Sequence, residues 1–355
     1  MGLEEKIKNI KILKDKSILD ALKQMDLHQK RLLLVFDNFD FINIITLGDL
    51  QRAIIKNISI DTNIETVLRK NTFIAKNFNS VQEIKKVMIE NRTECMPIVN
   101  ETGKLVDVFL WDDLFAEEEK IPQKGTLKLP VVIMAGGKGT RLKPLTNVLP
   151  KALIPLGEKT MLEEIMDSFS DYGVTDFHIT VNYKADLIKH FILEQSDKNY
   201  SVNFVKEDKE LGTAGSLHLL KNKIDKTFFV SNCDILVKND YSDFVEYHNE
   251  NKNEITIIAA LKHFPIPYGV IETKENGELI TIEEKPELTY KINSGLYILE
   301  PHLINEIPEN TFFHITHLIN LVKKRNGKIG VYPVSEKAWI DIGDWNEYLT
   351  NRYIK

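Results

Sequence analysis

The chain has 355 residues, of which 43% are hydrophobic and 28% are charged, so we expect a packed globular protein of two or three domains. A formal net charge of −6 without a basic tail argues against a general nucleic-acid-binding protein. The N-terminus lacks the apolar core of a signal peptide, no apolar run is long enough to span a membrane, and the two cysteines are far apart, so we expect a cytoplasmic protein.

The first 118 residues contain an approximate internal repeat of a helix, two strands and a second helix. In the first copy we expect a helix over residues 18–29, strands over 31–37 and 42–48, and a helix start at Asp49. In the second copy the same elements fall at residues 80–92, 95–100, 104–111 and 112–113. One such unit does not bury its apolar face alone, so two should pack together. The pattern resembles a pair of CBS domains, which implies a small α+β module over residues 1–118.

The resemblance to CBS domains also implies a nucleotide site. In many CBS pairs a T-x-x-D segment holds a ribose, and Thr46 and Asp49 occupy that pattern here. The second copy keeps Asp113 but lacks the threonine, so only one site for an adenine nucleotide looks intact. The alternative is a module that only packs or dimerises, and we expect a homo-oligomer.

A charged segment with Pro122 and Gly125 predicts a linker over residues 119–129. From residue 130 to 355, strands and helices alternate, which is typical of a doubly wound, mostly parallel sheet with helices on both faces. The expected strands are 131–134, 177–182, 202–206, 227–231 and 255–262, and the expected helices are 160–172, 184–194, 213–222, 240–250 and 312–325. A hairpin is expected near Tyr268 to Glu284, with its turn at Glu275-Asn276-Gly277.

A glycine-rich loop follows the first of these strands. It runs from Ala135 through Gly136, Gly137 and Gly139 to Thr140 and Arg141. Closely spaced glycines let backbone N–H groups turn toward an anion, and the arginine adds a bidentate phosphate contact. The spacing is that of neither a P-loop nor a dinucleotide fingerprint.

The loop and the residues after it resemble the signature G-G-x-G-T-R-L-x-P-L-T…P-K-x-x-x-P-[VL] of sugar-nucleotide pyrophosphorylases, and the resemblance continues to Trp345. It implies a Rossmann-like, GT-A-like nucleotidyltransferase over residues 130–355. It also implies that the backbone from Ala135 to Gly137 lies against the nucleotide, that Arg141 holds its phosphates and that Lys151 contacts the α-phosphate.

The segment from Glu207 to Thr213 resembles the E-x-x-x-L-G-T-A-G segment of mannose-1-phosphate guanylyltransferases, where it lies over the base. A carboxylate accepts well from the N–H donors of guanine, so GTP is the expected donor, with Glu207, Gly212 and Thr213 in its site. The alternative is that Glu207 belongs to a charged, solvated loop, which leaves CTP or UTP open.

Two aspartates are candidates for a metal site. Asp234 follows the apolar strand 227–231, at the end where parallel sheets bind ligands, after a small Cys233 that we expect to be buried rather than nucleophilic. Asp341 lies in a segment that resembles the family's W-x-D-x-G-[TD] pattern. That resemblance implies that Asp234 and Asp341 hold Mg²⁺, an ion that prefers oxygen ligands.

Three further segments resemble the sugar side of the family: Tyr268-Gly269-Val270, Glu284-Lys285-Pro286 and the segment from Asn293 to Tyr297. The resemblance implies that Gly269, Glu284 and Asn293 contact the sugar and that Lys285 holds its phosphate. Asn182, at a strand end, is a further expected sugar contact.

The expected reaction is the transfer of a nucleoside monophosphate to a sugar 1-phosphate, with release of pyrophosphate. A CBS pair in front of such a domain resembles the architecture of the glucosamine-1-phosphate guanylyltransferases of legionaminic acid synthesis, which implies glucosamine 1-phosphate as the acceptor. Mannose or heptose 1-phosphate, or CTP or UTP as donor, stays open, as does a catalytically silent nucleotide sensor.

Overall fold

The computed structural model describes residues 3–70, 72–76, 79–91, 93–115, 126–195, 199–343 and 345–351, with no side chains described at 112, 113 and 351. Its contacts divide the chain into two compact units, residues 1–124 and 125–355. Most of the predicted linker lies outside the described residues, so the boundaries at 118 and 130 stay predictions.

The front unit confirms the internal repeat. Each copy has a three-stranded sheet in which the first two strands are parallel and the last two antiparallel. The first sheet contains β1 (Lys11–Leu13), β2 (Leu32–Asp37) and β3 (Asp40–Thr46), and the second contains β4 (Ala75–Lys76), β5 (Cys95–Val99) and β6 (Leu105–Leu110). The helical elements are α1 (Leu3–Ile7), α2 (Ile18–His28), α3 (Leu47–Ile55), η1 (Ile64–Val67), α4 (Val81–Asn91) and α5 (Trp111–Leu114).

Helix α3 starts two residues before the predicted start at Asp49. Thr46 is its N-cap, its hydroxyl accepts from the Asp49 backbone N–H at 3.3 Å, and the Asp49 carboxylate accepts from the Thr46 backbone N–H at 2.9 Å. This reciprocal capping box satisfies two backbone donors that the helix leaves unpaired. The T-x-x-D segment therefore has a structural role at the start of α3.

The second unit is built on a seven-stranded sheet in the order β11-β10-β7-β12-β17-β14-β18. Its strands are β7 (Val131–Ala135), β10 (Asp176–Val181), β11 (Ser201–Lys206), β12 (Phe228–Asn232), β14 (Ile255–Pro265), β17 (Glu287–Leu299) and β18 (Ile329–Val334). β17 is antiparallel to both of its neighbours, and the other neighbouring strands are parallel. The predicted mostly parallel sheet is confirmed, whereas β17 and β18 were not predicted as strands.

Alternating side chains of the central strands bury both faces of this sheet. On one face, Phe229 packs against Phe169 with ring centroids 5.2 Å apart. On the other face, Phe228 and Val230 share a core with Leu217. The first face is covered by α7 (Met161–Ser170) and α10 (Tyr241–Glu250), and the second by η4 (Ser216–Leu220), η6 (Pro301–Glu306) and α11 (Ile315–Lys324). The doubly wound architecture is thereby confirmed.

Shorter elements complete the second unit: η2 (Thr140–Leu142), α6 (Leu145–Val148), η3 (Lys151–Leu153), β8 (Pro155–Leu156), β9 (Lys159–Thr160), α8 (Ala185–Leu193), α9 (Gly212–Gly215), β13 (Ile235–Val237), η7 (Glu336–Ala338), β19 (Trp339–Asp341) and α12 (Trp345–Asn351). The helix predicted over residues 213–222 is instead split between α9 and η4. No helix among the described residues combines the length and the apolarity needed to cross a membrane.

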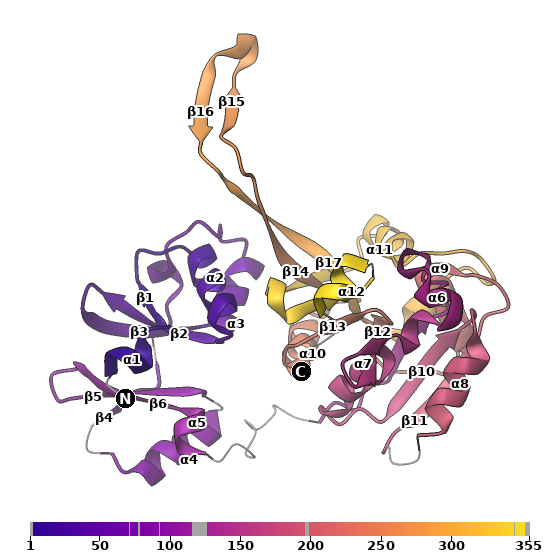
Figure 1. Ribbon diagram of the computed structural model, residues 1–355, viewed down its shortest axis with the longest axis horizontal. Helices are drawn as coiled ribbons and strands as arrows, with labels where there is room; N and C mark the ends of the chain where they lie inside the picture. Colours follow the sequence, from indigo (N-terminus) through magenta and orange to yellow (C-terminus); the bar gives the residue numbers. More distant parts are fainter. Residues whose placement is uncertain are drawn as a thin grey trace. The chain divides into compact units, whose positions relative to one another are not determined.

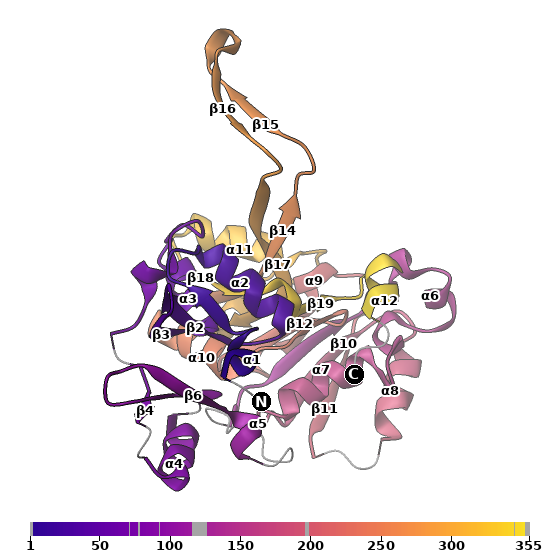
Figure 2. The same ribbon diagram turned by 60° about the vertical axis from the view of Figure 1, so that its left-hand side comes forward.

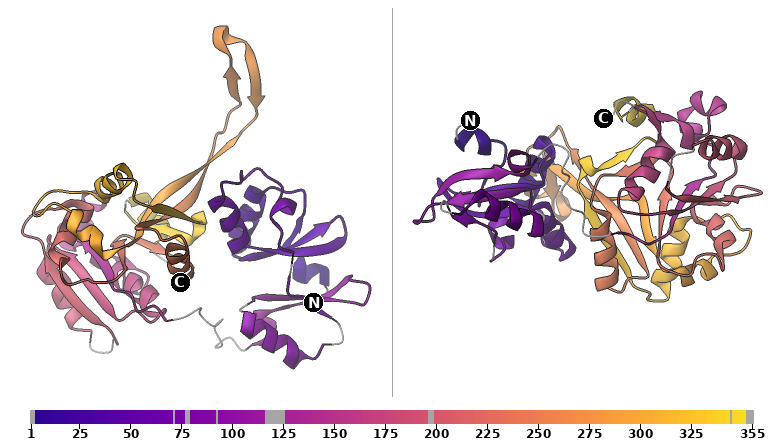
Figure 3. Two further views of the ribbon diagram at one scale, coloured as in Figure 1. Left: turned by 180° about the vertical axis from the view of Figure 1, so that it is seen from behind. Right: turned by 90° about the horizontal axis from the view of Figure 1, so that it is seen from below.

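The predicted hairpin is present and longer than expected. β14 and β17 pair as far as Pro265 and Glu287, and the chain continues into β15 (Val270–Thr273) and β16 (Leu279–Glu283), joined by η5 (Glu275–Gly277). We call residues 264–290 the arm. The arm stands away from the seven-stranded sheet in Figures 1 and 2 and in the left-hand view of Figure 3.

Candidate active site

The candidate site lies at the carboxyl ends of four neighbouring parallel strands. β7 ends at Ala135 and is followed by the glycine-rich loop, while Asn182 and Glu207 follow β10 and β11 directly. Asp234 comes two residues after the last residue of β12. Because carboxyl ends of parallel strands share one edge of a sheet, these residues from distant parts of the sequence meet there.

A short strand pairing brings the two candidate metal ligands together. β13 pairs with β19 so that Ile235 lies opposite Asp341, and the Ile342 N–H donates to the Asp234 carbonyl at 3.0 Å. Burial raises the pKa of Asp341, and the nearby charge of Asp234 raises it further. Two carboxylates in one partly buried place need cations to stay ionised.

Two basic side chains supply positive charge. The Lys151 ammonium forms an ion pair with the Asp234 carboxylate, and both side chains are largely buried. A methyl group on Gly343 would lie 2.8 Å from Asp341 Oδ1, 3.1 Å from Arg141 Nη2 and 3.2 Å from Asp234 Oδ2. The small space beside Gly343 is therefore where the side chains of Asp234, Asp341 and Arg141 converge.

The donor chemistry of this group suits a magnesium ion. Asp234 and Asp341 offer carboxylate oxygens only, and their mutual repulsion is relieved by a cation. The Asp341 carboxylate is oriented by the Gly343 N–H, which donates to Oδ1 at 2.6 Å. These two residues are compatible with a hard divalent cation, with phosphate oxygens and waters as its remaining ligands.

The glycines of the loop have different neighbours. A methyl on Gly136 would lie 2.5 Å from Glu207 Oε1, whereas a methyl on Gly137 would meet nothing within 4 Å. Gly139 has a left-handed backbone with φ 62°, and a methyl there would lie 2.9 Å from Thr146 and 3.0 Å from Lys151. A side chain at Gly136 or Gly139 would thus clash with neighbouring protein atoms, whereas Gly137 leaves open space for a ligand.

This contrast predicts opposite results for two alanine substitutions. Gly136→Ala forces a methyl against the Glu207 carboxylate, so we expect a loss of roughly 1–3 kcal/mol in the free energy of unfolding. Gly137→Ala should leave stability unchanged and raise the KM for the nucleotide at least about tenfold. Denaturant unfolding and initial rates on the two variants measure both effects. Equal stability of the two variants would contradict the prediction.

Glu207 is 5% exposed, so the alternative of a charged, solvated loop is wrong for this residue. Its carboxylate accepts from the Leu211 N–H at 3.3 Å and from the hydroxyls of Thr180 and Ser216, while burial raises its pKa. The carboxylate that was expected to accept from guanine is thus engaged by protein donors beneath Gly136. Its contact with the base stays a prediction.

Gly212 and Thr213 hold the start of α11. A methyl on Gly212, where φ is 79°, would lie 2.8 Å from the Phe313 carbonyl oxygen. The Thr213 hydroxyl accepts from the Ile315 N–H at 3.1 Å and lies 3.3 Å from His314 Nδ1. The structure therefore gives both residues a packing and capping role, and their contact with a nucleotide stays a prediction.

The expected sugar contacts fall in three places. The Asn182 amide donates to the Glu207 carbonyl at 2.8 Å, beside the glycine loop. Asn293 is on β17, where its side chain accepts from the Gly295 N–H at 3.2 Å. Gly295 lies against Asn232, near Asp234.

The other three expected sugar contacts, Gly269, Glu284 and Lys285, lie on the arm. Glu284 Oε2 is 3.0 Å from a methyl built on Gly269, and the backbone N–H of Lys285 donates to the Tyr268 carbonyl at 3.2 Å.

Cys233 agrees with its expected role as a small buried residue. It is 7% exposed, and burial raises the pKa of its thiol to about 12. A thiol that stays protonated at neutral pH is a poor nucleophile.

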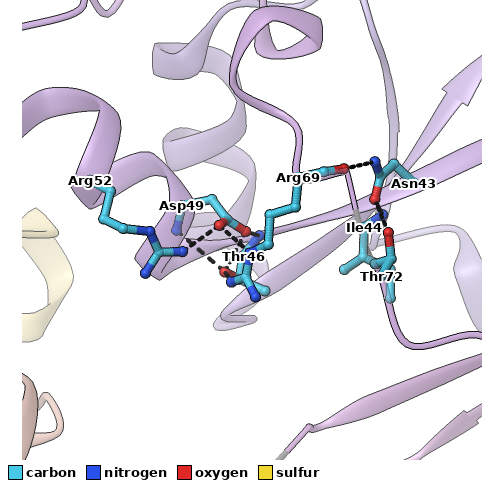
Figure 4. A network of polar contacts seen from close by, with 7 residues as sticks. All are labelled: Asn43, Ile44, Thr46, Asp49, Arg52, Arg69 and Thr72. Carbon is cyan, nitrogen blue, oxygen red and sulfur yellow. Dashed lines mark hydrogen bonds and ion pairs between the residues drawn. The ribbon is translucent and has the colours of Figure 1, made fainter. Parts of the chain in front are cut away.

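A second polar network lies in the front unit, around Asp49 (Figure 4). Asp49 is 6% exposed, and its carboxylate accepts from the Thr46 hydroxyl at 2.7 Å and forms ion pairs with Arg52 and Arg69. Arg69 also donates to the Thr46 hydroxyl at 2.8 Å. The two arginines, which were not predicted, place positive charge beside Thr46 and Asp49, where the resemblance to CBS domains implies a ribose. The side chain of Asp113 lies outside the described residues.

From the surroundings of Asp49 we predict that the stability of the front unit depends on pH. Burial raises the pKa of Asp49, but hydrogen bonds from Arg69 and Thr46 outweigh burial and hold the pKa below its usual value. A lowered pKa stabilises the folded state above the unfolded pKa of about 4, and this contribution is lost as the pH falls further. We expect Asp49→Asn to lower the free energy of unfolding by about 1–2 kcal/mol at pH 7, because charge-assisted hydrogen bonds are lost. The decrease in stability between pH 5 and 3 should also be smaller in the variant, as measured by calorimetry. The exposed Asp61→Asn is the control, and an unchanged pH profile in Asp49→Asn would contradict the prediction.

Comparison with known families agrees with this geometry. Residues 130–353 match the family model for nucleotidyl transferases. Residues 7–56 and 59–120 each match the model for a CBS domain. A mannose-1-phosphate guanyltransferase of Yarrowia lipolytica is 38% identical over 235 residues, and one of Schizosaccharomyces pombe is 33% identical over 232 residues. Each alignment spans 62% of this chain, and 62% and 63% of the respective relative.

Solved structures of related proteins resemble the second unit of this chain. HddC from Yersinia pseudotuberculosis is 29% identical, with a TM-score of 0.51, over 63% of this chain and 98% of that chain. The same protein complexed with GMP-PN is 28% identical, with a TM-score of 0.50, over 63% of this chain and 98% of that chain. The family model covers residues 130–353, well over half of the sequence. The chain belongs to the nucleotidyl transferase family and carries a pair of CBS domains in front of its transferase domain.

Proposed function

We propose that the chain transfers GMP from GTP to a sugar 1-phosphate and releases pyrophosphate. The observation that carries this proposal is the convergence of Asp234, Asp341, Lys151 and Arg141 at the strand ends beside the glycine loop. GTP is favoured by the names of the related guanyltransferases and by the GMP-PN complex of HddC.

In the proposed reaction, an oxygen of the sugar phosphate attacks the α-phosphorus of GTP in line, and the bond to the leaving pyrophosphate breaks. The attacking oxygen is ionised at neutral pH, so no side chain has to remove a proton. Lys151 and Arg141 stabilise the charge that develops on the phosphates, and the backbone at Gly137 lies against the nucleotide. Asp234 and Asp341 would hold Mg²⁺, which neutralises phosphate charge when it is bound.

The acceptor is proposed as a class, with two leading members. Glucosamine 1-phosphate is favoured by the combination of a CBS pair with the transferase domain, and mannose 1-phosphate by the names of the relatives. The decisive test is pyrophosphate release from GTP, CTP, UTP and ATP against a panel of sugar 1-phosphates. Turnover with GTP and one hexose 1-phosphate supports the proposal. Release with CTP or UTP alone overturns the choice of base, and no release with any pair overturns the reaction.

We also propose that the front unit binds an adenine nucleotide. Thr46 and Asp49 would hold the ribose, and the side chains of Arg52 and Arg69 are 57% and 45% exposed and so are accessible to phosphates. Calorimetry of the full chain with AMP tests this proposal. We expect saturable heat that Arg69→Ala weakens at least about tenfold. Binding that is absent, or that Arg69→Ala leaves unchanged, would remove the site.

A further inference from the structure

The arm carries an unusual number of exposed apolar side chains. Ile271, Leu279, Ile280 and Ile282 are 59%, 56%, 55% and 60% exposed, although each belongs to a paired β-strand. At the base of the arm, the cross-strand partners Phe264 and Leu288 are 41% and 42% exposed. Contiguous exposed apolar residues of this kind mark a surface that another partner covers.

The register of the arm sorts these side chains onto one face. Ile271 lies opposite Ile282, and after a register shift Thr273 lies opposite Leu279. Since alternate residues of a strand point to the same face, Ile271, Leu279 and Ile282 share a face, and Ile280 lies at the bulge between the last two. The opposite face carries Glu272, Thr281 and Glu283, together with the partly buried Val270. The arm thus has the pattern of a sheet that is buried on one face and solvated on the other.

A two-stranded hairpin is marginally stable in water on its own and gains stability when its apolar face is covered. The arm stands away from the sheet of its own unit (Figures 1 and 2). We propose that the apolar face of the arm packs against the same face of the arm of a second copy of this chain, in a two-fold symmetric dimer contact. A self-complementary patch of this kind is what a two-fold axis requires.

Area and charge both favour a second copy. The four apolar residues at the tip of the arm are 55% to 60% exposed and offer roughly 450 Å² per protomer, so two arms would bury about 900 Å², close to the size at which specific interfaces begin. The carboxylates of Glu272 and Glu283 lie on the opposite faces and would point outward from the contact. Packing through the apolar faces therefore separates the acidic groups of the two arms.

Charge reversal on each face of the arm tests the proposal. Ile282→Lys places an ammonium in the contact, and Thr281→Lys places one on the outer face as the matched control. In sedimentation equilibrium of the full chain we expect wild type and Thr281→Lys to have the same mass and Ile282→Lys to have half of it. Both sites are exposed in the single chain, so the circular dichroism spectra of the two variants should match that of wild type. Equal masses for all three proteins would overturn the proposal.

Cross-linking gives a second, independent readout. The two native cysteines are buried, so a new cysteine on the arm is the accessible thiol. We expect Ile282→Cys or Ile280→Cys to form a disulfide between two copies when diamide is added, and Thr281→Cys to remain single-chain. Cross-linking of Thr281→Cys alone would assign the contact to the other face and overturn the proposal, as would the absence of cross-links in all three variants.

Discussion

Asp234→Asn is expected to reduce turnover at least about 1,000-fold with saturating GTP and sugar 1-phosphate. The asparagine keeps the shape of the side chain but removes the charge that pairs with Lys151 and that a divalent cation needs. The Ile342 N–H donates to the backbone carbonyl of residue 234, so the pairing of β13 with β19 remains. The loss should therefore appear in kcat, measured by pyrophosphate release, and not in the circular dichroism spectrum.

The control for this prediction is Asp225→Asn. Asp225 is an exposed aspartate just before β12, at the opposite end of the strand that leads to Asp234, so the same chemical change is made on the same segment. This variant should keep the wild-type rate. A binding readout separates the metal from the fold: Mn²⁺ paramagnetic resonance should detect a bound ion in wild type and Asp225→Asn but not in Asp234→Asn. A rate for Asp234→Asn within tenfold of wild type would contradict the site.

The fold and the position of the site were largely predictable because both depend on local patterns. Apolar runs such as residues 131–134 that end at glycines predict buried parallel strands, and the carboxyl ends of such strands form one edge. The repeat in the front unit was visible for the same reason. The strand β17 was missed because its first half, Glu287 to Lys291, lies mainly in the exposed arm and has no uniform apolar pattern.

The partners inside the site could not be predicted, because they depend on tertiary contacts. Glu207 stands in a run of charges in the sequence, yet it is buried against Gly136 and held by the Leu211 N–H. Arg69 is twenty residues from Asp49, and no motif links them. In the sequence, Gly343 is only the glycine of the W-x-D-x-G-[TD] pattern that contains Asp341. Its importance follows from the three charged side chains around it, which no single-sequence argument brings together.

Gly343→Ala is expected to lower kcat about 10- to 100-fold. Its methyl would lie 2.8 Å from Asp341 Oδ1, a carboxylate that the residue's own N–H fixes at 2.6 Å, and about 3 Å from Arg141 and Asp234. Since misplacement of catalytic groups by about 1 Å costs about 100-fold, the methyl should disturb alignment. Gly48→Ala is the control, because its methyl lies 3.4 Å from its nearest neighbour, an ordinary contact. If Gly343→Ala turns over like Gly48→Ala, the space beside Gly343 is not the centre of the site, and the metal ligands must be sought elsewhere.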